Sequence, residues 1–420
     1  MDLHAPFIRA SAQYGTFAHP IPAPYLRRSF VCDTAAKATL QIGVLGFYEL
    51  FLNGERITKG AFAPYISNPN DIVYYDEYHV TLHAGENVVG ILLGNGFTNN
   101  EGGHIWDFDK ADYRTAPQVS FSLSYTDSEG QVQTIVSDEQ FRTAPSPIVF
   151  DDYRFGEHYD ARLEIPGWNL SDFDDSAADP IIVKRELTPV SIVKEGDGYR
   201  YDFGENCAGV CRLTVKGETG QTVDMRYGEE LVDGLLDQKS IWFVTDSTEH
   251  DWPLVHHDIY TCKGGEEETY TPTFTYHGFR YVVVTGITEE QATPSLLTYL
   301  VMHSDLDERG SFSCSDEMAN TLMTLCRRSD LANFFYFPTD CPQREKNGWT
   351  GDAALSCEHM LLTLTPETSY REWMRNICKA QADCGSIPGI VPTGGWGSRW
   401  GNGPAWDCVL VNLPYFVWCY

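Results

Sequence analysis

The stretch Phe47-Tyr48-Glu49-Leu50-Phe51-Leu52-Asn53-Gly54 decides the fold class of the first part of the chain. A run of apolar and aromatic residues that ends in Asn-Gly is typical of a strand that turns straight into a hairpin, because Asn and Gly tolerate the positive φ angles of a tight turn. Similar short runs surround it, at residues 41–45, 87–93 and 118–125. Short strands bounded by turn signals predict an antiparallel β-sandwich.

A second group of strand-like segments follows a polar stretch at residues 186–198, which contains a proline. These segments are rich in β-branched and aromatic residues. They occupy residues 210–215, 222–227, 269–275 and 279–285. We therefore predict two β-sandwich domains, the first at residues 1–190 and the second at residues 191–302.

The pattern changes near residue 305, where apolar residues begin to recur at helical spacing. Helices are predicted over residues 315–328, 352–364, 367–384 and 407–420. We predict that residues 303–420 form an all-helical domain with long loops at 333–351 and 384–406. Residues 409–420 are almost wholly apolar, and an apolar helix needs partners on its faces. We interpret the helical domain as incomplete; the alternative is a terminal helix docked in a groove of this chain.

The composition excludes several classes of partner. The chain has 420 residues, and its 30 basic and 59 acidic residues give a net charge of −29, which argues against nucleic acid and anionic membranes as partners. The start of the chain lacks the features of a secretory signal, and no apolar run approaches the roughly 20 residues of a membrane helix. We predict a cytoplasmic protein.

The cysteine and histidine spacing predicts neither a metal site nor a cofactor. The 12 cysteines are scattered without a Cys-x-x-Cys pair, and we interpret them as reduced thiols. His250, His256 and His257 form a loose cluster that no ligand spacing joins to the cysteines. Acidic residues are plentiful in the β-domains, but no loop has the ligand spacing of a calcium site.

The loop between the first two predicted helices carries the chemistry. Residues 340–352 hold three carboxylates, Asp340, Glu345 and Asp352, together with Arg344 and Trp349. One alternative is structural: Asp340 pairs with Arg344, Glu345 lies on the surface and Asp352 caps a helix. The functional interpretation is glycoside cleavage, which needs a carboxylic acid at the leaving oxygen and a second carboxylate on the anomeric side.

Glu345 is the candidate acid, because it has the longest reach of the three carboxylates and because Asp340 and Asp352 could raise its pKa by repulsion. Trp349 would pack on the apolar face of a sugar. A second loop, residues 393–406, holds three tryptophans among five glycines and predicts an aromatic-walled subsite. The alternative for this loop is a surface segment pinned by its tryptophans.

These motifs resemble the bacterial α-L-rhamnosidases of glycoside hydrolase family 78. The resemblance is carried by four stretches in the expected order, at residues 46–54 with 92–97, 202–209 with 274–281, 303–316, and 338–352. It implies two N-terminal antiparallel β-sandwich domains followed by the first helices of an incomplete (α/α)6 barrel. It also implies an inverting hydrolase that releases terminal α-L-rhamnose from plant glycosides or polysaccharides, with no metal or other cofactor.

By this resemblance, Glu345 takes the place of the general acid, and Asp340 and Asp352 match carboxylates that bind rhamnose hydroxyls. Trp349 and Trp406 match aromatic residues of the sugar pocket, and Arg344 matches a supporting arginine. The chain departs from the family pattern at 345–347, where Glu-Lys-Asn stands for the usual Asp-Glu-Arg.

The second departure from the family pattern concerns the general base. In the family this base is a glutamate late in the barrel, so we expect it beyond Tyr420 and expect this chain alone to lack normal hydrolase activity. The alternatives are a non-catalytic carbohydrate-binding fragment, a glycosidase for glucose or glucuronic acid on the same barrel, and one half of a split enzyme whose barrel a separate chain completes.

Overall fold

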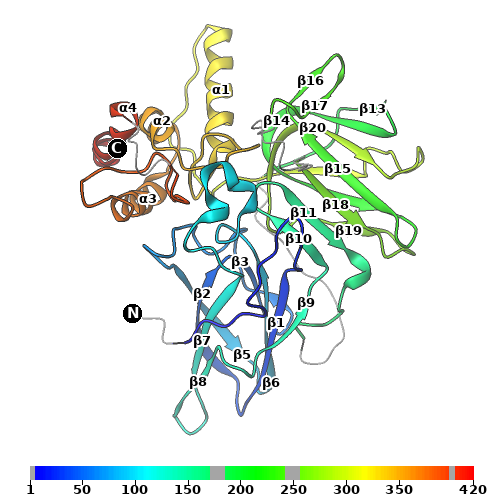
Figure 1. Cartoon of the computed structure of the whole chain (residues 1–420), viewed down its shortest axis with the longest axis vertical. Helices are drawn as coiled ribbons and strands as arrows, with labels where there is room; N and C mark the ends of the chain where they lie inside the picture. The colour runs from blue at the N-terminus through cyan, green and yellow to red at the C-terminus, as the bar shows by residue number, and fades with distance from the viewer. Residues whose placement is uncertain (1–4, 171–184, 242–255, 397–402) are drawn as a thin grey trace.

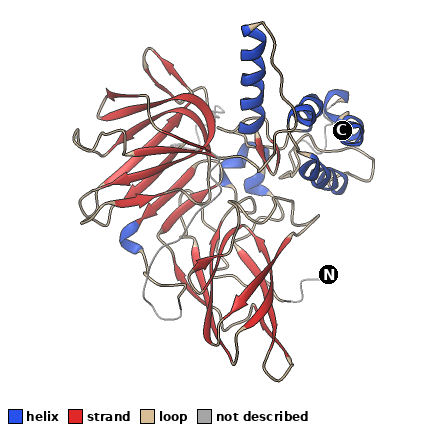
Figure 2. Cartoon of the chain, turned by 180° about the vertical axis from the view of Figure 1, so that it is seen from behind, coloured by secondary structure: helices blue, strands red, loops and turns tan. Residues whose placement is uncertain are grey.

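The computed structural model describes residues 5–170, 185–241, 256–396 and 403–420. In Figure 1 the first β-sandwich lies at the bottom, a second large sheet lies at the upper right, and the α-helices lie at the upper left. The view from behind in Figure 2 shows strands filling two of these parts and the long helices confined to the third. The predicted order of β-domains followed by helices is thus confirmed.

The first sandwich packs two antiparallel sheets face to face, in the orders β4-β3-β6-β1-β9 and β5-β2-β7-β8. Its strands are β1 (Pro24–Cys32), β2 (Ala36–Leu45), β3 (Phe47–Leu52), β4 (Glu55–Arg56), β5 (Tyr75–Leu82), β6 (Gly85–Gly94), β7 (Gln118–Thr126), β8 (Val132–Val136) and β9 (Arg142–Pro145). Leu40, Leu50, Ile91 and Phe121 are fully buried in one apolar core to which both sheets contribute. Two 3-10 helices, η1 (Glu101–Trp106) and η2 (Phe108–Lys110), follow β6.

The hairpin predicted at Asn53-Gly54 is confirmed. Asn53 has φ 53° and Gly54 has φ 86°, the positive values that a tight two-residue hairpin turn requires. Leu52 pairs with Glu55 directly across the turn. The Asn53 side chain also accepts a hydrogen bond from the Val88 backbone N at 2.8 Å, so the turn is tied to the next strand.

The second sheet has ten strands, with the main order β10-β11-β18-β15-β20-β14-β21-β12 and with β13 and β19 both paired to β14. They are β10 (Ile148–Asp152), β11 (Gly156–Asp160), β12 (Arg185–Leu187), β13 (Ser191–Glu195), β14 (Gly198–Val215), β15 (Thr222–Gly228), β18 (His257–Thr261), β19 (Glu268–Tyr270), β20 (His277–Thr285) and β21 (Leu297–Val301). A separate ribbon pairs β16 (Glu230–Val232) with β17 (Leu235–Asp237), and η3 (Ala161–Leu163) follows β11.

The β10-β11 hairpin joins this second sheet through a parallel pairing of β11 with β18. Residues 148–160 precede the predicted domain boundary at residue 190, yet they pair with strands that follow it. No short stretch of sequence indicates a pairing between such distant segments. The predicted boundary at residue 190 stays a prediction.

The helical part contains α1 (Glu317–Ala332), α2 (Thr350–Thr363), α3 (Glu367–Lys379), α4 (Pro404–Asp407) and α5 (Val409–Cys419). The N-terminus of α1 is capped by Asp316, whose side chain accepts a hydrogen bond from the Met318 N at 2.8 Å. The third helix ends at Lys379, short of the predicted 384, because Gly385 with φ 91° closes a turn with Ala382 and Ser386. A two-strand ribbon, β22 (Phe334–Phe335) with β23 (Phe337–Pro338), was not expected from the sequence.

The helices bury one side at most. Helix α1 has no buried residue, and Leu322 is 59% exposed. Helix α5 buries Val409, Leu413 and Val417 and contacts α2 and α3, while Trp418 on its other side is 82% exposed. Among the described residues, no helix combines the length and the hydropathy that crossing a bilayer requires.

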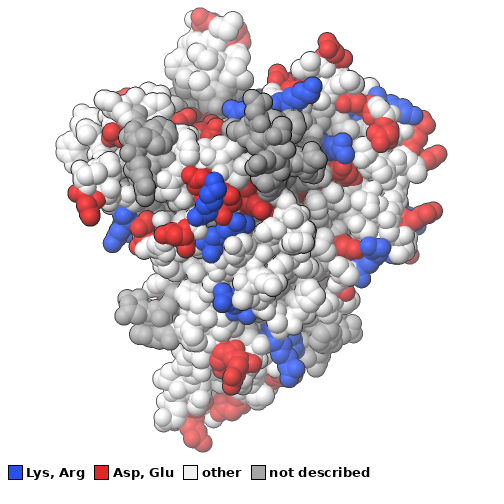
Figure 3. Space-filling view, viewed as in Figure 1, with Lys and Arg blue, Asp and Glu red and all other residues white. Residues whose placement is uncertain are grey.

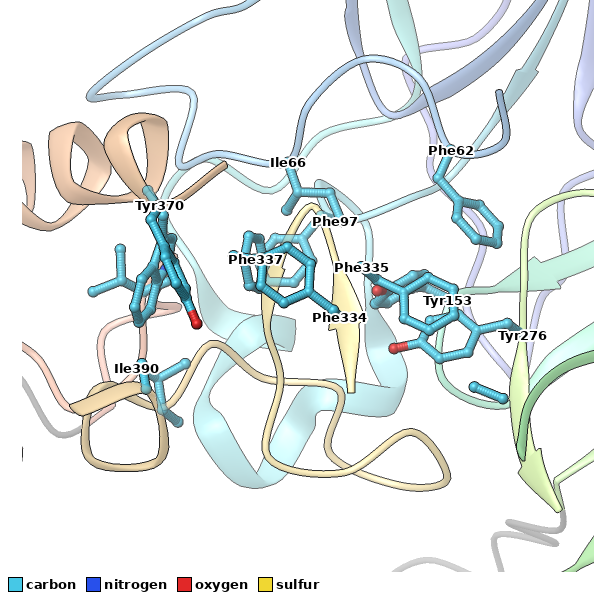
Figure 4. Packing of buried hydrophobic residues seen from close by; sticks show 14 of the residues in the cluster. Phe62, Ile66, Phe97, Tyr153, Tyr276, Phe334, Phe335, Phe337, Tyr370 and Ile390 are labelled. Carbon is cyan, nitrogen blue, oxygen red and sulfur yellow. The ribbon is translucent and has the colours of Figure 1, made fainter. Parts of the chain in front are cut away.

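One apolar cluster joins all three parts of the molecule (Figure 4). The Phe335 ring stacks on the Tyr276 ring of the second sheet, with 3.8 Å between the ring centroids. The Phe62 ring lies 6.4 Å from Phe335, and the Tyr153 ring lies 5.5 Å from Tyr276. This packing fixes the segment that leads into the loop at 340–352.

Candidate functional site

The loop at 340–352 runs from β23 to α2 and is fastened to residues 389–391. The Thr350 N donates to the Gly389 O at 2.8 Å, and the Val391 N donates to the Gly348 O at 2.9 Å. A Cβ at residue 348 would lie 2.2 Å from the Val391 O, so only glycine allows this approach. The loop is therefore held against residues 389–391 at the start of α2, and we call it the ledge.

Glu345 and Trp349 lie side by side on this ledge. The Trp349 Nε1 donates to the Glu345 Oε2 at 2.7 Å, which fixes the direction of the carboxyl group. The Trp349 ring lies 6.5 Å from the Trp406 ring and 5.6 Å from the Trp396 ring, measured between centroids. The two tryptophan loops predicted from the sequence thus meet in one aromatic wall beside a carboxyl group. Trp400 of the second loop lies outside the described residues.

Asp340 lies next to Glu345. Carboxyl oxygens of Asp340 and Glu345 and the Sγ of Cys341 are all within 4.8 Å of one another. Burial, followed by the charge of Glu345, raises the pKa of Asp340 to about 7. Asp340 accepts hydrogen bonds from the Cys341 Sγ at 3.0 Å and from the Asn347 N at 3.2 Å. Asp340 therefore keeps its proton to a higher pH than an ordinary aspartate does.

Asp340, Cys341 and Glu345 form a cluster of side chains of the types that bind metal ions. Burial, reinforced by the Asp340 charge, raises the pKa of the Cys341 thiol far above its ordinary value. A thiol that keeps its proton is a poor ligand, since metals bind the thiolate. The sequence prediction of no metal site stays a prediction.

The other predicted site residues surround the ledge. Asp352 is the third residue of α2, and its charge is among the influences that raise the pKa of Asp340. A Cβ at residue 351 would lie only 2.7 Å from the Trp406 Nε1, which explains why residue 351 is glycine. The Arg344 Nη1 donates to the Ser240 O at 3.4 Å, so this side chain reaches toward the second β-domain.

Sequence reasoning missed a buried lysine inside the motif. Lys346 is fully buried with φ 52°, and its Nζ donates to the Tyr153 O at 2.9 Å, to the Arg154 O at 3.3 Å and to the Tyr276 O. Its ammonium also lies 4.4 Å from the centroid of the Tyr276 ring. Burial, followed by the charge of Arg154, lowers the pKa of Lys346 to about 7.

Arg154, between β10 and β11, was also missed, and it binds the residues on both sides of that lysine. Its Nε donates to the Glu345 O at 2.8 Å, and its Nη2 donates to the Asn347 Oδ1 at 2.5 Å. Its guanidinium lies 4.7 Å from the centroid of the Phe108 ring. The candidate acid is therefore positioned from the β-domains, across more than 190 residues of sequence. No local sequence signal indicates such a contact.

A polar cavity of about 450 Å³ opens beside Asp340. It is lined by residues 204–207 and Glu229 of the second sheet, by α1, and by residues 340–343. Burial raises the pKa of Glu229, whose carboxyl accepts a hydrogen bond from the Asn206 amide at 2.8 Å. Over the face seen in Figure 3, basic groups lie among acidic ones and form no continuous patch.

Three family models of α-L-rhamnosidases match this chain in succession. The Alpha-L-rhamnosidase N-terminal domain matches residues 33–196, the bacterial concanavalin-like domain matches 194–303, and the bacterial 6 hairpin glycosidase domain matches 307–420. An α-L-rhamnosidase of Formosa agariphila is 32% identical over 366 residues, which is 81% of this chain and 38% of the relative. The chain thus spans well under half the length of that curated relative.

Solved structures agree. The α-L-rhamnosidase of Dictyoglumus thermophilum superposes with a TM-score of 0.84 at 29% identity, over 99% of this chain and 49% of that one. The Streptomyces avermitilis α-L-rhamnosidase, solved with L-rhamnose, superposes with a TM-score of 0.83 at 29% identity, over 95% and 40% of the two chains. Sequence, domain order and fold lead to one assignment: the chain belongs to the bacterial α-L-rhamnosidases of glycoside hydrolase family 78.

Proposed function

We propose that this chain supplies the acid-bearing side of an α-L-rhamnosidase active site, with Glu345 as the general acid. The observation that carries the proposal is the hydrogen bond of 2.7 Å from the Trp349 Nε1 to the Glu345 Oε2. It places a directed carboxyl group against the aromatic wall on which a sugar ring would pack. The family names of the relatives support rhamnose as the sugar.

The reaction is a single displacement with inversion. The Glu345 carboxyl gives its proton to the glycosidic oxygen as the bond from that oxygen to the anomeric carbon breaks. A water attacks the anomeric carbon from the opposite face, and a second carboxylate takes the proton of that water. The resemblance gives this second role to a glutamate of the later barrel helices, and we assign it to none of the described residues.

The remaining residues of the ledge bind the sugar. Trp349 and Trp406 pack on its apolar face, and Asp340 and Asp352 bind hydroxyl groups. Because the pKa of Asp340 is about 7, its carboxyl group donates a hydrogen bond to a hydroxyl oxygen below that pH and only accepts above it. Arg344 supports the loop from the side of the second sheet.

The partners are a rhamnose-containing glycoside and further barrel helices, on the same polypeptide or on a separate chain. All 12 cysteines are unpaired, which supports the cytoplasmic location predicted from the sequence. We expect this chain alone to release rhamnose poorly. Robust release from an aryl rhamnoside by the purified 420 residues would overturn that expectation.

The catalytic role is tested in a chimera in which this chain is followed by the part of the Dictyoglumus thermophilum relative that lies beyond the matched segment. We expect the chimera to cleave an aryl α-L-rhamnoside and to yield the β anomer first. Glu345→Gln should lower kcat by about 10²–10⁴-fold. Glu317→Gln, at an exposed carboxylate of α1, is the matched control and should change kcat little.

A chimera that is selective for another sugar in a panel of aryl glycosides would overturn the substrate. An active Glu345→Gln chimera would overturn the acid assignment. Binding of rhamnose without hydrolysis in the chimera would support the carbohydrate-binding alternative.

A further inference from the structure

Two histidine rings meet on the outer face of the second sheet, away from the ledge. His158 lies in β11 and His257 begins β18, and these two strands pair in parallel. Along β18, His257, Ile259 and Thr261 are half-buried, whereas Asp258 and Tyr260 are buried. His158 is opposite Ile259 in the register, so both histidines project from the solvent side of the sheet.

The two rings present their Nε2 atoms to each other. These nitrogens are 3.4 Å apart, the ring centroids are 5.2 Å apart, and the ring planes are inclined by 84°. Rings that pointed straight at each other would separate their centroids by the nitrogen distance plus two ring radii, which exceeds 5.2 Å. The two rings therefore do not point straight at each other but meet at an angle.

The distance between the two nitrogens fits a tetrahedral metal ion. Two nitrogens bound to one zinc ion at about 2.0–2.1 Å, with a tetrahedral angle between them, lie about 3.3 Å apart. The separation of 3.4 Å between His158 and His257 matches this value without any movement of either ring.

A carboxylate orients one of the rings from behind. The His257 Nδ1 lies 3.0 Å from the Asp224 Oδ1, on the neighbouring strand β15. Since a carboxylate only accepts hydrogen bonds, the Nδ1 carries a proton, and in the neutral ring the Nε2 presents its lone pair. This carboxylate–histidine arrangement is the usual second shell of a metal-bound imidazole.

The surrounding charges favour a cation. Asp224 and the buried Asp258 are the anionic groups that act on His158. Arg226 opposes them in part, because its Nη2 lies 3.0 Å from the Asp224 Oδ2.

We propose that His158 and His257 form a two-histidine site for Zn²⁺, with Asp224 as its outer-sphere carboxylate. Water fills the remaining positions from the solvent side of the sheet. No local pattern in the sequence indicates the site, because the two ligands are 99 residues apart. His256 is buried and lies outside the pair. His250, the third member of the predicted cluster, lies outside the described residues.

The test is a Zn²⁺ titration of the full 420-residue chain, stripped of metal with a chelator. Five exposed cysteines could also bind zinc, so they are first alkylated in the native protein. We expect one saturable site per chain in calorimetry. His158→Gln and His257→Gln should each weaken binding at least tenfold, and Asp224→Asn should weaken it about tenfold.

Two further measurements make the result decisive. His79→Ala is the matched control, because that side chain is 79% exposed in the first sandwich, and it should bind Zn²⁺ like the wild type. Zn²⁺ should raise the Tm of the wild type and of the His79 variant but not that of a folded His158→Gln protein. Equal binding by wild type and His158→Gln, or no saturable binding by the wild type, would show that the pair merely shares a proton.

Discussion

The β-domains and the helical part of this chain differ in how completely they bury their apolar residues. In the sandwich, Leu40, Leu50 and Phe121 are fully buried between two sheets. In the helices, Leu322 is 59% exposed and Leu355 is 85% exposed. A sheet pair closes its own core, whereas an apolar helix face needs a further element against it. The difference indicates where stability resides within these residues and where further packing is needed.

The ledge belongs energetically to the well-packed part, although its sequence lies among the helices. Lys346 and Phe335 are buried against residues of the β-domains, and Arg154 holds the backbone around Glu345. The candidate acid is thus placed by the part of the molecule that closes its own core.

The largest change in the free energy of unfolding is expected where Phe335 packs on the second β-domain. Phe335 is 5% exposed and stacks on Tyr276, so Phe335→Ala removes a large buried ring and leaves a cavity. We expect it to lower the free energy of unfolding by about 3–5 kcal/mol, measured by urea denaturation. A loss below about 1 kcal/mol would contradict the assignment of the ledge to the packed core.

The buried lysine should make stability depend on pH. The pKa of Lys346 is lowered from 10.5 to about 7 in the folded chain. Between these values the unfolded state binds more protons, so stability rises with pH, by at most about 1.4 kcal/mol per pH unit. We compare the wild type with Lys346→Met by chemical denaturation from pH 6 to 10. The stability of the wild type relative to the variant should increase with pH, and a constant difference would contradict a buried, perturbed amine.

Asp340 should make stability fall as the pH rises, over a lower pH range than that of Lys346. Its pKa is raised from 3.8 to about 7, so between these values the folded state binds more protons and stability falls as pH rises. Asp340→Asn cannot titrate. The stability of the wild type relative to this variant should therefore decline from about pH 4 to 7, again by no more than about 1.4 kcal/mol per unit. A rise over this interval would show that Asp340 is ionised and well paired instead.

The smallest change in the free energy of unfolding is expected at the exposed faces of the helices. Leu322→Ala in α1 should change the free energy of unfolding of this chain by less than about 0.5 kcal/mol, because the side chain is 59% exposed. A loss comparable to that of Phe335→Ala would mean that α1 is covered in solution. The same substitution in the chimera, where further helices follow, tests whether this face is buried there.

Local patterns in the sequence predicted much of the fold. The Asn53-Gly54 turn and the strands around it depend on neighbours in the chain, and the structure confirms both. The loop at 340–352 was predicted as the candidate site because its unusual residues are contiguous. The pairing of β11 with β18 left no local mark and was not predicted.

The rest of the site depends on contacts that no short window contains. Lys346 was interpreted only as a departure from the family motif, although its ammonium is bound by carbonyl groups 70 and 193 residues away. Arg154 carries no motif of its own and acquires its role only when the β10-β11 turn docks on the ledge.

The ledge with Trp349 and Glu345 should bind a rhamnose ring, and saturation-transfer NMR with this chain measures that binding. Free L-rhamnose should receive saturation from the wild-type protein, D-glucose should receive none, and Trp349→Ala should abolish the transfer, while Trp418→Ala, at an exposed ring of α5, should leave it unchanged. Equal transfer to both sugars, or transfer that survives Trp349→Ala, would contradict the account.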